Sequence, residues 1–200
     1  MQRMDRADFL RWGAAGAVAA GGGVLAGPAA AALPPPAPQG DDVAFLAFGA
    51  VAERASLAWY RDALRVHGFS RGERRRLVSG AGAKVGHINR LNQALGADAV
   101  AAGDFEAAFP TRDMATRRRA LRLGGEVESL LVGVYLNGAA FARDSATRLL
   151  LGRLLAYDAQ QLAWMRNLAG VAASGLPDPL SVEQAGAQLD RLITTPAFTS

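Results

Sequence analysis

The sequence contains no cysteine. This absence excludes a disulfide framework, a thiolate metal site and a lipid-modified cysteine anchor. Aromatic residues make up only 7% of the chain and β-branched residues are scarce, whereas alanine, leucine, arginine and glycine dominate. Such a balance favours helices and disfavours strands. Because a single core usually serves roughly 100 to 200 residues, we expect one all-α domain preceded by a leader.

Lysine is almost absent, and Lys84 is the only one in the chain. The other basic side chains are arginines, which form short runs at residues 74–76 and 117–119. Such runs can build a surface for an acidic polymer, but interspersed acidic residues favour solvated helix faces. We therefore expect no nucleic-acid partner. No nucleophile motif, phosphate-binding glycine loop or dinucleotide fingerprint is found, so hydrolase and nucleotide-enzyme functions have little support.

Residues 1–32 are typical of a signal peptide, with a basic start, a run of small and apolar residues from 12 to 27, and a stretch rich in alanine. The segment around Arg6 and Arg11 resembles the twin-arginine export motif, with Ala7 where the second arginine belongs, so the Sec route stays open. The apolar run is shorter than the about 20 residues of a spanning helix. We expect an exported protein, in the periplasm, cell envelope or extracellular space, without a stable membrane span after leader cleavage.

The rest of the chain has the spacing of a helical bundle. A proline-rich linker at 33–40 leads into apolar residues at helical spacing over 41–172, and a tail with a short helix follows at 173–200. Capping boxes at Ser70–Glu73 and Ser181–Gln184 mark two helix starts. The predicted helices cover 41–68, 70–96, about 112–143, 144–170 and 181–193, and residues 97–111 form a crossover.

One polar pattern occurs in each half of this bundle. A glutamate is followed by a tyrosine seven residues later, two helical turns away on the same face, and the next helix has two polar residues three apart. The number of residues from the glutamate to the last residue of the set is nearly the same in both halves, so the halves look like copies of one another. The sets are Glu53, Tyr60, Lys84 and His87 in the first half, and Glu128, Tyr135, Asp158 and Gln161 in the second.

This pattern resembles the inward-facing ligands of ferritin-like di-iron and di-manganese proteins, with single glutamates on two helices and Glu-x-x-His on the other two. In outline the chain is similar to exported ferritin-like proteins of the desiccation-related type. The resemblance implies a four-helix bundle, two antiparallel hairpins joined by a crossover, plus a short C-terminal helix. Glu53 and Glu128 match the single glutamates, His87 matches the first histidine, and Asp158 is a shortened bridging carboxylate.

Two positions depart from the family set. Gln161 replaces the second histidine, although its amide oxygen is still a possible ligand, and Lys84 puts an ammonium in place of the first bridging glutamate. Two metals are therefore not expected. Three carboxylates facing one ammonium leave a surplus of negative charge, which one divalent ion would balance. Alternatively, Lys84 takes the place of the metal by forming an ion pair with Glu53 or Asp158. We favour the ion pair.

The sequence thus predicts a degenerate site with no cofactor, and one divalent ion, iron or manganese, is the alternative. Tyr60 and Tyr135 are expected to donate hydrogen bonds to the carboxylates, because buried phenols need partners. The predicted function is a non-catalytic binding or structural role in the cell envelope. A metal-binding oxidoreductase or metal-sequestering protein is the alternative, and the partner and a homo-oligomeric state stay open.

Overall fold

The computed structural model describes residues 40–101, 105, 107–172 and 175–194, so the predicted leader and most of the linker lie outside the described residues. Within these ranges the chain is helical, with one isolated bridge between Ala108 and Thr194. The elements are α2 (Gly40–Ala63), α3 (Arg71–Leu95), the 3-10 turn η1 (Gly96–Asp98), α4 (Thr111–Met114), α5 (Arg117–Phe141), α6 (Ser145–Ala169) and α7 (Val182–Leu192). The predicted all-α class is confirmed.

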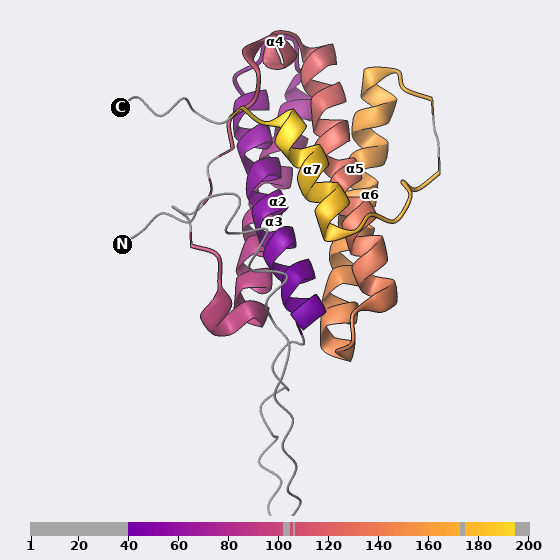
Figure 1. The fold of residues 1–200 in the computed structure, drawn as a ribbon. Coiled ribbons are helices and arrows are strands. Elements are labelled where there is room, and N and C mark those ends of the chain that lie inside the picture. Colours follow the sequence, from indigo (N-terminus) through magenta and orange to yellow (C-terminus); the bar gives the residue numbers. More distant parts are fainter. Residues whose placement is uncertain (1–39, 102–104, 106, 173–174, 195–200) are drawn as a thin grey trace, which may run out of the picture.

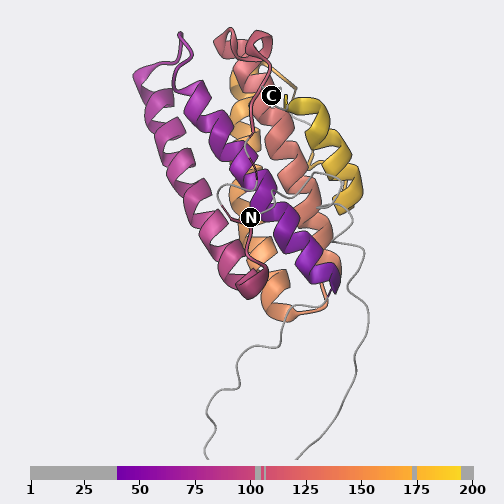
Figure 2. The ribbon, with the colours of Figure 1, turned by 60° about the vertical axis from the view of Figure 1, so that its left-hand side comes forward.

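The bundle consists of the four long helices, α2, α3, α5 and α6. Figures 1 and 2 show that they pack side by side. Helices α2 and α3 make one antiparallel hairpin and α5 and α6 the other, and α5 begins near the end of the bundle opposite to the end of α3. Extensive contacts join α2 with α5, whereas α3 and α6 contact each other far less. Helix α7 lies across α5 and also touches α2. The predicted two hairpins, crossover and short C-terminal helix are therefore confirmed.

Both predicted capping boxes are present, at the starts of α3 and α7. The first helix ends at Ala63, earlier than predicted, because Arg74 donates hydrogen bonds to the Leu64 and Val66 carbonyls and so stabilises a turn there. The predicted third helix is divided into α4 and α5. The cause is Thr116, which has an extended backbone and whose side chain caps α5.

The two arginine runs are partly structural rather than wholly solvated. Arg117 forms an ion pair with Glu73, and so ties the start of α5 to the start of α3. The Arg76 guanidinium lies 4.9 Å from the centre of the Trp164 ring, a cation–π contact between α3 and α6. The surface left for an acidic polymer is correspondingly smaller than the sequence indicates.

The core admits large aromatic rings because glycines face them. Trp59 and Tyr60 are fully buried, and the Trp59 indole donates a hydrogen bond to the Ala120 carbonyl at 2.9 Å. A Cβ added at Gly80 would lie 2.4 Å from the Tyr60 ring, and one at Gly124 would lie 2.4 Å from the Trp59 ring. These glycines therefore set how closely the helices approach.

None of the helices in the described part of the chain combines the length and the apolar character needed to cross a bilayer.

Gly80 and Gly82 provide a matched test of this packing. Gly80→Ala should destabilise the protein by about 1–3 kcal/mol, because the new methyl group overlaps the buried Tyr60 ring. Gly82→Ala, on the same helix with open space around it, should be neutral or stabilise by up to about 1 kcal/mol through helix propensity. Urea unfolding followed by circular dichroism measures both, and equal effects of the two substitutions would refute the packing argument.

Candidate functional site

The bundle brings the six residues predicted to form the metal or ion-pair site into its interior. Each helix contributes, with Glu53 on α2, Glu128 on α5, and a pair of residues on each of α3 and α6. Amphipathic spacing explains this placement, since each polar residue lies on the face that also carries the buried leucines. Burial is complete for Glu53, Lys84, Glu128 and Asp158, and His87 and Gln161 are 6% exposed.

The Lys84 ammonium lies at the centre of the cluster. Its Nζ donates hydrogen bonds to Asp158 Oδ1 at 2.7 Å and to Glu128 Oε2 at 3.0 Å. Glu53 Oε2 also lies 3.0 Å away, as an ion pair without hydrogen-bond geometry. One side chain of α3 is thus paired with a carboxylate from each of the other three bundle helices. We call Lys84 and these three carboxylates the lysine cluster.

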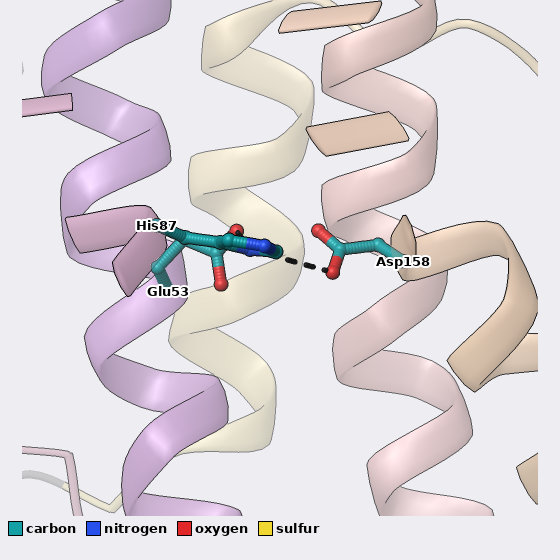
Figure 3. A group of neighbouring side chains, drawn as sticks. All are labelled: Glu53, His87 and Asp158. Atoms are coloured by element: carbon teal, nitrogen blue, oxygen red, sulfur yellow. Dashed lines mark hydrogen bonds and ion pairs between the residues drawn. The ribbon is translucent and has the colours of Figure 1, made fainter. Parts of the chain in front are cut away.

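His87 lies beside the lysine cluster, and Figure 3 shows its ring between Glu53 and Asp158. Its Nδ1 is 3.0 Å from Glu53 Oε1 and 3.8 Å from Asp158 Oδ1. Each of the three residues offers one ligand atom, and these atoms lie within 4.8 Å of one another. The His87 ring also contacts Tyr157 of α6 edge to face, with 5.0 Å between ring centres. The sequence analysis did not identify Tyr157, because this residue lies outside the repeated polar pattern.

The two tyrosines of the repeat behave differently. Tyr135 donates a 2.9 Å hydrogen bond to Glu53 Oε1, as predicted. The prediction for Tyr60 is wrong, because its hydroxyl has no hydrogen-bond partner among the described residues. Its ring is held against Gly80, and Ser56 instead donates to Glu128 Oε1 at 2.7 Å. Ser56 is one turn from Glu53, but the second half of the repeat has Leu131 at that position, so the repeat gave no signal for it.

Burial and the ammonium set the protonation of the cluster. Burial raises the pKa of Glu53, but the Lys84 charge and the His87 hydrogen bond outweigh it and lower that pKa from 4.5 to about 2. Burial dominates at Glu128 and Asp158 and raises both pKa values, that of Asp158 well above 3.8. Burial disfavours the charged Lys84, yet the three carboxylates raise its pKa well above 10.5. Glu53 is therefore the carboxyl group of the cluster that most favours its charged form.

These contacts decide how many metal ions the site fits. Two divalent ions do not fit, because the ammonium already contacts all three carboxylates and would repel them. One ion fits better, on the side formed by Glu53, His87 and Asp158. Asp158 Oδ2 lacks a hydrogen bond within the described chain, and carboxylate oxygens suit hard cations.

Comparison with known families agrees with this geometry. A family model described as a ferritin-like domain matches residues 41–171, which include every residue of the site. The chain matches no curated protein and no solved structure.

Removing the ammonium tests its structural importance. Lys84→Met keeps the side-chain length but leaves the carboxylates unpaired, so it should destabilise the protein by about 3–5 kcal/mol at neutral pH. Adding Glu128→Gln and Asp158→Asn to Lys84→Met should restore part of this loss by removing the buried negative charges. Urea unfolding measures both, and a cost below about 1 kcal/mol for Lys84→Met would contradict the charged lysine cluster.

Proposed function

The chain belongs to the ferritin-like domain family, and from this premise we propose that it is an exported bundle in which the lysine cluster replaces the family's metal pair. Its role is non-catalytic, as a binding or structural protein of the cell envelope. The proposal rests chiefly on one observation, the contact of Lys84 Nζ with all three cluster carboxylates at 2.7–3.0 Å.

The ammonium competes with a metal for the same oxygens. Divalent ions need carboxylate oxygens that are not already paired with a cation, and here Lys84 pairs with an oxygen of each of the three carboxylates. Loss of the bridging carboxylate at position 84 also removes a ligand that two ions would share. Family membership therefore supplies the fold, and position 84 argues against two-metal oxidation chemistry.

The metal content of the purified protein tests this proposal. We expect the native protein to carry well below one equivalent of iron or manganese after purification from an exporting host, by elemental analysis. Lys84→Glu restores the family's carboxylate and should bind divalent metal, because it exchanges a competing cation for an oxygen ligand. The matched control Lys84→Gln removes the charge without adding a carboxylate and should bind less than Lys84→Glu.

A second candidate function follows from the group Glu53, His87 and Asp158. These residues can hold one divalent ion beside the ammonium, in a metal-sequestering or weakly oxidising protein. Metal near one equivalent in the native protein, lost in both Asp158→Asn and His87→Gln, would support this candidate and overturn the metal-free proposal. Metal that survives both substitutions would be bound elsewhere.

Export is proposed from the leader sequence, which lies outside the described residues. In a bacterial host with both export routes, the full chain should reach the envelope fraction and lose about 32 residues, as intact-mass measurement shows. Replacing Arg6 and Arg11 together by lysine should block this processing if the twin-arginine route is used, and leave it largely unchanged if Sec is used. Retention of the uncleaved native chain in the cytoplasm would contradict export.

A further inference from the structure

A hollow of about 380 Å³ lies outside the lysine cluster and is lined by residues of α4, α5 and the end of α7. These segments lie near one end of the bundle (Figure 1). Four arginines line it, namely Arg112, Arg119, Arg122 and Arg191. They come from three different helices, so the fold and not one basic run brings them together. We call this hollow the arginine pocket.

Two of these guanidinium groups make no interaction that stabilises the fold. Arg122 and Arg191 are exposed and have no hydrogen bond or ion pair with any described residue. Arg119 donates to the Arg112 carbonyl, and Arg112 makes only an exposed 3.5 Å contact with Asp113. The donors of Arg122 and Arg191 in particular are free to face a ligand.

The carboxylates of the pocket do not neutralise it. Among the described residues, its acidic lining consists of Asp113 and Glu126, against four arginines. Glu126 forms no hydrogen bond or ion pair with an arginine among the described residues, and burial, then the negative charge of Asp113, raise its pKa. The described lining of the pocket therefore keeps a net positive charge.

We propose that the arginine pocket binds a small phosphomonoester. Guanidinium forks match phosphate oxygens, and the positive surplus suits the roughly −1.5 to −2 charge of a phosphomonoester at neutral pH. The rest of the lining is apolar, with Pro110, Leu123 and Leu192. That surface makes no favourable contact with inorganic phosphate but can contact the organic part of an ester, since small-ligand sites combine apolar walls with a few charged groups.

The position of the pocket favours a compact ligand over a polyanion. A nucleic acid or other long polymer needs a continuous basic track. The nearby arginines of the two runs are partly taken up, because Arg117 is paired with Glu73 and Arg76 stacks on Trp164. The arginine pocket instead brings two unpaired guanidinium groups, those of Arg122 and Arg191, from different helices into one concave site.

This inference gives a ligand class to the binding role proposed above but does not depend on the lysine cluster. The pocket residues make no contact with Lys84, so the metal content of the protein and its affinity for a phosphomonoester are separate measurements. Failure of one proposal leaves the other unaffected.

The experiment titrates the secreted protein with phenyl phosphate by isothermal calorimetry at low salt. Arg122→Gln and Arg191→Gln should each weaken binding about tenfold, as expected for loss of a charged hydrogen bond. Arg118→Gln, an exposed arginine of α5 outside the pocket, is the matched control and should leave the affinity within about twofold. Inorganic phosphate should bind more weakly than phenyl phosphate, because it does not use the apolar wall. Circular dichroism verifies that each variant is folded.

Three results would overturn the proposal. They are no binding of phenyl phosphate, an equal loss of affinity in the Arg118 control, or unchanged affinity in both pocket variants. Flotation with vesicles containing phosphatidic acid separates the two sources of a phosphomonoester. Binding to vesicles without binding to phenyl phosphate would exclude a small soluble ligand and assign the pocket to a lipid surface.

Discussion

The relative register of the four long helices depends on one buried ammonium. Lys84 reaches carboxylates of α2, α5 and α6 at 2.7–3.0 Å, so all four long helices must place a polar residue in the same layer. A one-turn shift of any helix would leave a charge buried without a partner, at a cost of several kcal/mol. Replacing the whole cluster by apolar residues need not destabilise the protein. The cluster's clearest contribution is therefore to fix helix register.

Much of this architecture is readable from the sequence because it depends on local rules. Helix class, both capping boxes and the inward repeat follow from spacing and side-chain chemistry. The different contacts of the two tyrosines do not follow from the sequence. Tyr60 is held against a glycine of another helix, and Ser56 makes the hydrogen bond to Glu128 that a symmetric repeat assigns to Tyr60. The early end of α2 is likewise set by Arg74 from the next helix. Such tertiary contacts leave no periodic signal.

Helix α5 contributes residues to both the lysine cluster and the arginine pocket. Glu126 and Glu128 are two residues apart, about 200° around the helix, so one faces solvent and the other the core. Glu128 is fully buried and bonds Lys84, whereas Glu126 lines the arginine pocket. Both carboxyl groups have raised pKa values, mainly through burial. The buried lysine cluster and the exposed arginine pocket thus share helix α5 without sharing any side chain.

The burial of Lys84 has a chemical consequence of its own. The chain has a single ε-amine, and the fold leaves none of it exposed and keeps it protonated, whereas acylation requires an accessible neutral amine. Reagents that acylate amines should therefore spare the ε-amine of the folded bundle and modify it only when the helices separate. The rate of that modification therefore reports how often the core opens. The native sequence supplies the reporting amine, so no label needs to be added.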